Sequence, residues 1–171
     1  MPDIIKIINQ MPQIVADDWQ LIRDSAPSEH QTFAHKIFPF AALNDPGNAA
    51  VFDQVQAVWI APDDDFEASI ATLLRMQLIA VDFPSFRDGR GYSIATLLRT
   101  RYGWNRELRA VGDVLRDQLN YMRRCGFDAF AVRADKDIRD TIKSFSHYTV
   151  QYQGAVDNPL PLFRKRHGGT E

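Results

Sequence analysis

Acidic and basic side chains gather in the stretch DFPSFRDGRGYSIATLLR, which spans residues 82–99. The stretch begins where the apolar run of residues 78–81 meets the carboxylate of Asp82, and it continues into a helical segment with Ile94 and Leu98 on one face. This pattern predicts a strand, a charged loop and a helix. In open α/β sheets and in barrels, ligands bind at the loops that follow the carboxyl ends of the strands. We therefore predict the functional site in this loop.

Three carboxylates are the candidate catalytic groups, namely Asp82, Asp88 and Asp113. Asp82 ends one predicted strand and Asp113 follows another through Gly112, so both should lie at the same edge of the sheet. Paired carboxylates at such an edge could exchange protons with a ligand or orient it. Asp82 could equally form an ion pair with an arginine, and Asp113 could cap the helix that follows it. The sequence supports both interpretations.

The turn Asp88-Gly89-Arg90-Gly91 precedes the predicted helix and has the composition of an anion site. Its glycines allow backbone N–H groups to approach a ligand, the helix N-terminus attracts negative charge, and Arg90 could add a bidentate contact. The alternative is a tight turn in which Asp88 or Ser93 caps the helix. The turn is neither a Walker loop nor a GxGxxG fingerprint. We expect sulfite, sulfate, phosphate or a ligand carboxylate to bind there.

Arginine is the only basic residue type between positions 87 and 133, where it occurs ten times. Its planar guanidinium suits carboxylates, phosphates and other oxyanions, although several of these arginines can be simple surface charges. Arg109 lies inside a predicted strand that should be covered on both faces. We predict that Arg109 is buried and paired with Glu107, Asp82 or Asp113. The candidate ligand-binding residues are Arg87, Gly89, Arg90, Gly91, Tyr92, Arg109 and Arg116.

The single cysteine, Cys125, excludes an internal disulfide and a cluster held by four thiolates of this chain. Arg123 and Arg124 would lower the pKa of its thiol, but a helix C-terminus would raise it, and a buried inert thiol is the commoner fate. The four histidines lack the spacing of metal ligands, so we predict no metal site. Electrons for any redox reaction would come from a partner or an organic cofactor, which the sequence leaves unknown.

Length and composition are those of one globular domain. The 171 residues are 45% hydrophobic and 25% charged, which is ordinary for such a domain. The first fifteen residues do not have the pattern of a signal peptide, and no apolar run approaches the length of a membrane span. We expect a cytoplasmic protein without membrane association. The net charge of −2 and the lack of a recognised RNA module argue against nucleic-acid binding.

Residues 57–157 alternate between strand-like and helix-like patterns and form the predicted core of βα units. Residues 1–56 are the poorly patterned N-terminal part of the same domain, and residues 158–171 form a C-terminal tail. Such units are right-handed and parallel, so the predicted fold is α/β with a mainly parallel sheet, either open or a partial barrel. The predicted strands are residues 57–61, 78–83, 107–111, 127–132 and 148–153, and the predicted helices are residues 66–77, 91–102, 113–125 and 135–146.

The N-terminal part carries weaker signals. Residues 19–22 predict a short strand, and residues 37–40 predict an edge strand or a loop because Pro39 cannot donate to a ladder. Residues 45–48, with the sequence DPGN, predict a turn. None of these signals points to a functional residue.

The segments FPSFRDGRGYSIATLLRTRYG and ELRAVGDVLRDQLNYMRRCGFDAFAVR resemble the bacterial domain-of-unknown-function family 934. The resemblance is strong over residues 57–133. It implies an oxidoreductase that takes part in sulfite reduction, with sulfite reductase as a partner, and it carries over no catalytic residue. Our first hypothesis is therefore an accessory or redox component of assimilatory sulfite reduction.

Two further hypotheses belong to other classes. The chain could be an enzyme acting on a small anion or an anionic metabolite, with Asp82, Asp88 and Asp113 as acid–base or orienting groups and arginines as clamps. It could also be a noncatalytic docking protein with oppositely charged regions. Residues 1–86 hold 4 basic and 12 acidic residues, a net charge of −8, whereas residues 87–171 hold 16 and 10, a net charge of +6. The two regions could also simply pack against each other.

Overall fold

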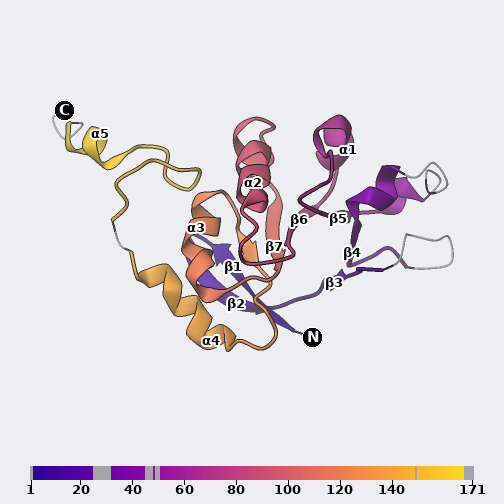
Figure 1. The fold of residues 1–171 in the computed structure, drawn as a ribbon, viewed down its shortest axis with the longest axis horizontal. Coiled ribbons are helices and arrows are strands. Elements are labelled where there is room, and N and C mark those ends of the chain that lie inside the picture. Colours follow the sequence, from indigo (N-terminus) through magenta and orange to yellow (C-terminus); the bar gives the residue numbers. More distant parts are fainter. Residues whose placement is uncertain (1, 25–31, 45–47, 49–50, 149, 168–171) are drawn as a thin grey trace.

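The structure, a computed structural model, describes residues 2–24, 32–44, 48, 51–148 and 150–167 (Figure 1). In these residues the strands form one eight-stranded sheet. The strands are β1 (Asp3–Ile8), β2 (Met11–Ala16), β3 (Gln20–Leu21), β4 (Lys36–Pro39), β5 (Ala57–Ile60), β6 (Leu78–Phe83), β7 (Glu107–Gly112) and β8 (Ala129–Phe130). The helices are α1 (Ile70–Leu73), α2 (Arg90–Thr100), α3 (Leu119–Arg124), α4 (Ile138–Thr141) and α5 (Leu162–His167).

Short 3-10 helices extend several of these helices. One precedes α1, another precedes α3 and a third follows α4, so three of the four predicted helices combine two helix types, and α2 is the exception. The 3-10 helices are η1 (Phe40–Asn44), η3 (Phe52–Gln54), η4 (Glu67–Ser69), η5 (Arg116–Gln118) and η6 (Ile142–Ser146).

The sheet is an open half-barrel with the strand order β2-β1-β8-β7-β6-β5-β4-β3. Neighbours from β3 to β8 are parallel and follow one another in the sequence. The predicted α/β class is therefore confirmed, but the sheet is mixed rather than mainly parallel. The difference comes from β1 and β2, which form an antiparallel hairpin and add it antiparallel to β8.

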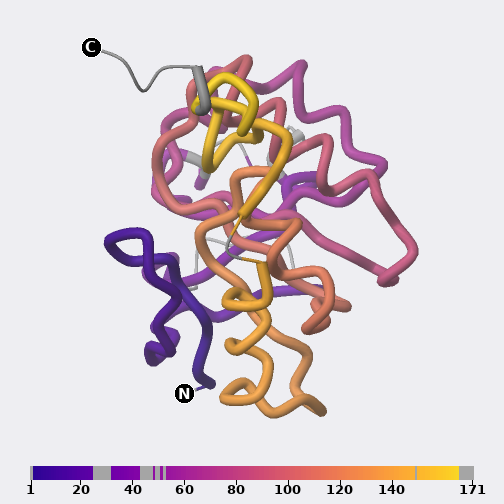
Figure 2. The backbone as a smooth tube through the Cα atoms, turned by 90° about the vertical axis from the view of Figure 1, so that its left-hand side faces the viewer, coloured from indigo at the N-terminus to yellow at the C-terminus, as the bar shows by residue number. Residues whose placement is uncertain are grey.

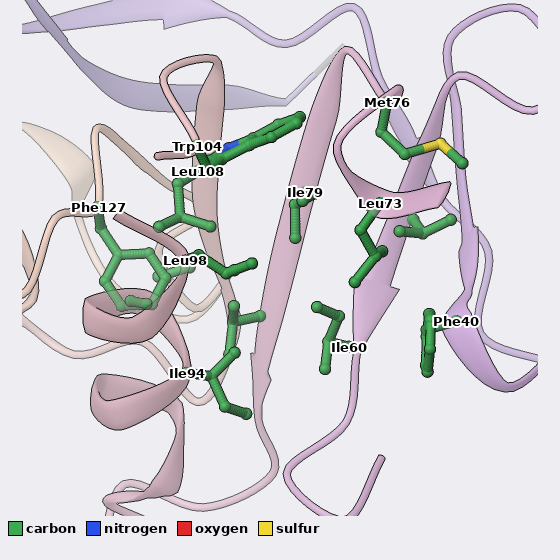
Figure 3. Packing of buried hydrophobic residues seen from close by; sticks show 14 of the residues in the cluster. Phe40, Ile60, Leu73, Met76, Ile79, Ile94, Leu98, Trp104, Leu108 and Phe127 are labelled. Carbon is green, nitrogen blue, oxygen red and sulfur yellow. The ribbon is translucent and has the colours of Figure 1, made fainter. Parts of the chain in front are cut away.

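The two faces of the sheet differ because side chains alternate along each strand. On β6, Ile79 and Val81 belong to the large core under the helices, whereas Leu78 and Ala80 belong to a smaller cluster on the concave face. Figure 3 shows the first of these cores, in which α2 packs over the middle strands. The smaller cluster consists of Ile37, Ala57, Leu78, Ala80 and Val111, with Trp19, Leu21, Trp59 and Ala131 packed against it.

The N-terminal hairpin turns at Asn9 and Gln10, whose φ angles of 50° and 66° are in the left-handed region. Before the turn, β1 pairs with β8 through Ile5 and Phe130. Figure 2 shows the hairpin lying close to the later part of the chain that contains α4. Residues 2–39, read as poorly patterned, thus contribute four strands to the same sheet.

Two sequence predictions outside the site are wrong. Among residues 148 and 150–153 no strand is formed, and Tyr148 and Tyr152 are 67% and 65% exposed. Alternating apolar residues there predicted a strand, but no neighbouring strand pairs with them. The helix expected over residues 113–125 begins at Arg116, because Asp113 is used elsewhere. The predicted turn at residues 45–48 and the end of the tail, residues 168–171, lie largely outside the described residues.

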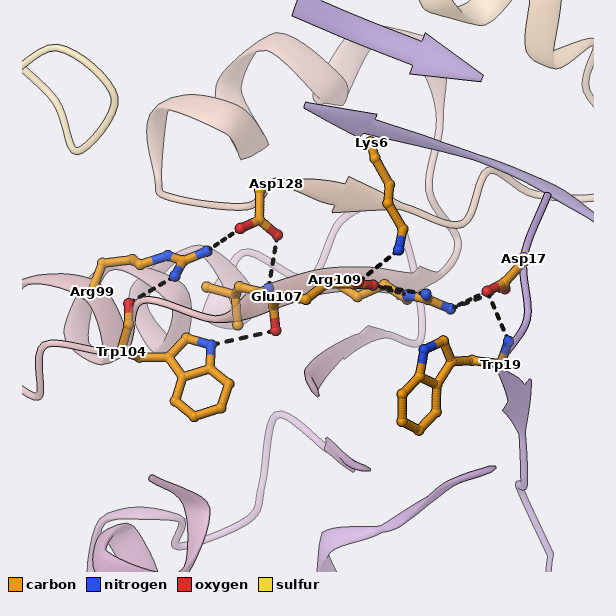
Figure 4. A network of polar contacts seen from close by, with 9 residues as sticks. Lys6, Asp17, Trp19, Arg99, Trp104, Glu107, Arg109 and Asp128 are labelled. Atoms are coloured by element: carbon orange, nitrogen blue, oxygen red, sulfur yellow. Dashed lines mark hydrogen bonds and ion pairs between the residues drawn. The ribbon is translucent and has the colours of Figure 1, made fainter. Parts of the chain in front are cut away.

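Arg99 ties α2 to the loops around β7. Its guanidinium donates to the carbonyl oxygens of Gly126, Trp104 and Arg106 and to Asp128 Oδ2, at 2.7 to 2.8 Å. Asp128 Oδ1 also accepts from a backbone N–H of β7, at 2.8 Å (Figure 4). Burial raises the pKa of Asp128, and Arg99 opposes this rise. These bonds fix α2 at the amino ends of β7 and β8, opposite the carboxyl ends where the candidate site lies. Nowhere in the described ranges is a helix long and apolar enough to cross a bilayer.

Candidate functional site

A cleft of about 490 Å³ opens at the carboxyl ends of four parallel strands. Arg23 follows β3, and Asp82 and Phe83 are the last two residues of β6. Asp113 follows β7, and Arg133 follows β8. β3 and β8 are far apart in the strand order, and the curl of the half-barrel brings their ends to one opening. The position of the cleft agrees with the general rule for ligand sites in α/β folds. Asp82 and Asp113 therefore share one opening. The lining residues are Arg23, Asp82, Phe83, Pro84, Gly112, Asp113 and Arg133.

Arg23 crosses the opening to meet Asp82. Its Nη2 donates to Asp82 Oδ1 at 2.8 Å, and its guanidinium carbon lies 5.1 Å from the centre of the Trp59 ring. The indole N–H of Trp59 in turn donates to the carbonyl oxygen of Ile22 at 2.8 Å, which fixes the ring. The Asp82 side chain is only 9% exposed, whereas that of Arg23 is 39% exposed. Asp82 and Trp59 thus fix the position of the Arg23 guanidinium, which stays accessible to solvent.

Asp113 organises the opposite side of the cleft. Its Oδ1 accepts from Arg133 Nη1 at 2.7 Å, and its Oδ2 accepts from the backbone N–H of Phe86 at 2.9 Å. It therefore braces the loop after β6 and does not cap the following helix. Arg133 also forms a bidentate ion pair with Asp135, in which Nε donates to Oδ1 at 2.6 Å and Nη2 donates to Oδ2 at 2.9 Å. Asp135 and then Asp113 raise the pKa of Arg133, and Arg133 holds the pKa of Asp135 below its usual range.

Gly112 permits the close approach of β6 and β7 at the floor of the cleft. Its φ angle is 93°, and an added Cβ would lie 2.4 Å from the carbonyl oxygen of Phe83 and 2.6 Å from Asp82 Oδ1. The backbone N–H of Asp113 donates to that same carbonyl oxygen at 2.7 Å. A side chain at this position would displace the carboxylate of Asp82.

Arg109 lies deeper on the concave face and is 1% exposed. Its Nη1 is 2.9 Å from both oxygens of Asp17, and its Nε and Nη2 donate to Glu107 Oε1 at 2.9 and 2.7 Å. Lys6 Nζ donates to the other oxygen of Glu107 at 2.8 Å (Figure 4). The predicted burial and the pairing with Glu107 are confirmed. Asp17, a second partner, comes from the N-terminal part and had not been predicted.

The match to known families covers residues 57–163, and the matching family is described as a bacterial protein of unknown function, DUF934. The chain belongs to this family. No curated protein and no solved structure matches it significantly. Within the DUF934 match lie Asp82, Asp113 and Arg133, while Arg23 and Asp17 precede it. The cleft is thus built jointly by the family region and by the strands that come before it.

Asp88 and Arg90 form a separate cluster and do not line the cleft. Arg90 donates from Nε and Nη2 to the two oxygens of Asp88, at 3.0 and 2.7 Å, and from Nη1 to Asp63. The backbone N–H of Arg90 also donates to Asp88, at 3.1 Å, so this carboxylate braces the start of α2. Asp88 is the main cause of a raised pKa of Arg90, and the pKa of Asp88 is lowered in return. Arg90 is thus paired with two carboxylates at a place outside the cleft.

The remaining candidate ligand residues lie apart from the cleft. The Arg87 guanidinium lies over the ring of Phe86, Tyr92 packs between the rings of Phe83 and Tyr121, and Arg116 donates to Asp140. The pKa of Tyr92 is raised by burial. None of these three side chains meets Asp82 or Asp113 in the described contacts.

Cys125 is buried, and burial raises the pKa of its thiol, so nothing marks it as a thiolate nucleophile. In the described ranges, no three His, Cys, Asp or Glu side chains are grouped as the ligands of a metal would be. The cleft offers two guanidinium groups and two carboxylates. The guanidinium groups can bind an anion, and the carboxylates can exchange protons with it.

Sequence reasoning missed Arg23 and Arg133 as members of the cleft. Both follow a predicted strand by one position, after residues 19–22 and 127–132. That position was the signal that pointed to Asp82, and it would have identified the two arginines as well.

Gly91 has a packing role, which a glycine pair can test. A Cβ at Gly91 would lie 2.6 Å from the ring of Phe83, whereas at Gly89 the nearest atom would be 3.9 Å away. We expect Gly91→Ala to lower the free energy of unfolding by about 1–3 kcal/mol, the usual cost of overpacking. Gly89→Ala should change it by less than about 1 kcal/mol. Urea denaturation of both variants measures this, and equal stabilities would show that Phe83 simply moves aside.

Proposed function

We propose that the chain binds a small oxyanion of the sulfite class in the cleft and serves as an accessory or redox component of assimilatory sulfite reduction. The observation that supports anion binding is the convergence of Arg23 and Arg133 on one opening, with Asp82 and Asp113 between them. The choice of sulfite rests on the sequence resemblance described above. The proposal includes a cytoplasmic location and sulfite reductase as the partner.

Arg23 is the primary anion-binding residue in this proposal. In the described part of the chain, its hydrogen bonds go to Asp82 alone, through Nη2. The other N–H groups of the fork meet no acceptor among the described residues, and guanidinium groups bind oxyanions in a bidentate manner. Because the Trp59 ring holds one face of the fork, little side-chain freedom is lost on binding.

Asp82, Asp113 and Asp135 pair with the two arginines, so the cleft has no excess of positive charge. The affinity of the cleft for an anion then depends on directed hydrogen bonds. The cleft should therefore favour an anion that also presents a proton donor, as hydrogen sulfite does. Either carboxylate can accept that proton or return it to a product. In this scheme the chain positions the anion and its protons, and sulfite reductase supplies the electrons.

Binding measurements on purified protein test the anion site. We expect Arg23→Gln and Arg133→Gln each to weaken sulfite binding by about 1.5–3 kcal/mol, the usual value of a hydrogen bond to a charged group. The matched control is Arg101→Gln, because the Arg101 side chain is 63% exposed, lies 3.6 Å from Glu67 and does not line the cleft. Calorimetric titration at fixed ionic strength gives the affinities. Equal affinities for the three variants would exclude the cleft as the anion site.

Growth of a deletion strain tests the cellular role. We expect growth on sulfide but not on sulfite or sulfate as the only sulfur source. Genes for the wild type and Arg101→Gln should restore growth on sulfite, and the gene for Arg133→Gln should restore it poorly. Unimpaired growth of the deletion strain on sulfite would contradict the proposed role even if the purified protein binds the anion.

A further inference from the structure

A second hollow, of about 470 Å³, lies on the concave face of the half-barrel. One of its walls comes from β7 and β8 and the other from β3 and β4, so the curl of the sheet creates it. Its lining is mostly apolar, and it consists of Pro2, Asp17, Asp18, Trp19, Gln20, Leu21, Ile37, Arg109, Val111 and Ala131. We call it the inner hollow.

The inner hollow and the cleft are lined by the same three chain segments. In each segment one residue lines the inner hollow, and the residue two positions later lines the cleft. In an extended chain, residues two positions apart point to the same face, as for Leu21 with Arg23 and Ala131 with Arg133. The segment after β7 instead turns at Gly112, whose φ angle is 93°. The inner hollow therefore adjoins the cleft along the axis of the half-barrel. The three pairs are Leu21 and Arg23, Val111 and Asp113, and Ala131 and Arg133.

The buried charges of the inner hollow, Arg109 and Asp17, are already paired, and the third charged lining residue, Asp18, is exposed. Arg109 donates to Asp17 and Glu107, and Lys6 completes the neutralisation of Glu107. A ligand in the inner hollow would therefore meet no free strong donor on its floor. It would contact mainly the side chains of Leu21 and Val111 and their apolar neighbours. An apolar group is the chemical match for such a surface.

We propose that the two hollows together bind one organosulfonate, with its sulfonate head in the cleft between Arg23 and Arg133 and its apolar chain in the inner hollow. The proposal rests on the proposed function, because the head occupies the site assigned to sulfite. It extends that function from an inorganic anion to an organic one. The adjoining positions and opposite chemical characters of the two hollows carry the inference.

A homologous series of ligands tests this proposal. Titration of the full chain with n-alkanesulfonates, from methanesulfonate to hexanesulfonate, should give an affinity that rises about fourfold per added methylene. Ala131→Phe fills the inner hollow, so it should abolish the gain in affinity per added methylene. The affinities for methanesulfonate and sulfite should stay unchanged. Ala71→Phe, on the exposed surface of α1, is the matched control and should keep the rise. Arg133→Gln should weaken every member by the same factor.

Leu21→Gln serves as a second probe, because it makes the inner hollow polar without filling it, in case Ala131→Phe fails to fold. It should reduce the rise per methylene. The wild type could bind sulfite but show the same affinity for every n-alkanesulfonate. That result would overturn the organosulfonate proposal and leave the sulfite proposal standing. An affinity that rises with the length of the alkyl chain, in a protein that does not bind sulfite, would support the organosulfonate proposal and contradict sulfite as the ligand. Absence of binding by every anion would overturn both.

Discussion

Arg109→Met should lower the free energy of unfolding by about 3–5 kcal/mol, the usual cost of breaking a buried ion pair. The substitution keeps much of the volume of the side chain but removes the partner of Asp17, which is 7% exposed. It also leaves Glu107 with Lys6 alone. An unpaired carboxylate in such a place is poorly solvated. Urea denaturation followed by circular dichroism gives the loss.

Arg101→Met is the matched control for this prediction, since it makes the same chemical change at an exposed ion pair. Exposed pairs contribute about 0–1 kcal/mol, so this variant should be close to the wild type in stability. The double variant Arg109→Met with Asp17→Leu should recover part of the loss because it removes both buried charges. Similar stabilities of the two single variants would show that water reaches Asp17 freely.

Gly112→Ala should combine a loss of stability with a loss of ligand binding. The φ angle of 93° is strained for alanine, and the new Cβ would collide with the Phe83 carbonyl oxygen and with Asp82. Backbone strain costs about 1–3 kcal/mol, and overpacking adds about 1–3 kcal/mol. Displacement of Asp82 would also release Arg23 from its position. We expect a clear fall in melting temperature together with weaker sulfite binding.

Gly103→Ala separates these effects. Gly103 also has a positive φ, 67°, but a Cβ there would have no neighbour within 4 Å. The substitution Gly103→Ala should therefore lower the free energy of unfolding only by the cost of backbone strain and should leave sulfite binding unchanged. If Gly112→Ala proved no more destabilising than Gly103→Ala, the close approach of the β6 and β7 ends would have to be readily adjustable.

The regular part of the fold was predictable from local signals. The strands β5 and β6 are short, largely apolar runs, and β7 has apolar residues on both sides of Arg109. The helix α2 begins after Gly89 and ends at Thr100, shortly before Gly103, whose positive φ suits the end of a helix. Arg109 was predicted to be buried because a charge inside a covered strand must be paired. Asp82 and Asp113 were placed together because the carboxyl ends of parallel strands share an edge.

The rest depended on tertiary contacts. The hairpin of β1 and β2 turns at Asn9 and Gln10 without the glycine that marks most tight hairpins, so its sequence gave little sign of it. Asp17 and Arg23 acquire their roles only when the half-barrel curls and brings β3 opposite β8. Residues 148 and 150–153 show the opposite case, because alternating apolar side chains do not make a strand without a neighbour to pair with.

The pairing of β1 with β8 has a consequence for synthesis of the protein. On the ribosome the hairpin emerges early, but Phe130, the partner of Ile5, is translated much later. The edge of β1 must therefore stay unpaired while most of the chain is made, and exposed strand edges are prone to wrong pairing. Contacts between distant segments form slowly, so we expect docking of the hairpin to be a late folding step. That step also delivers Asp17 to Arg109, and until then Glu107 of the same strand is the partner that remains to this arginine.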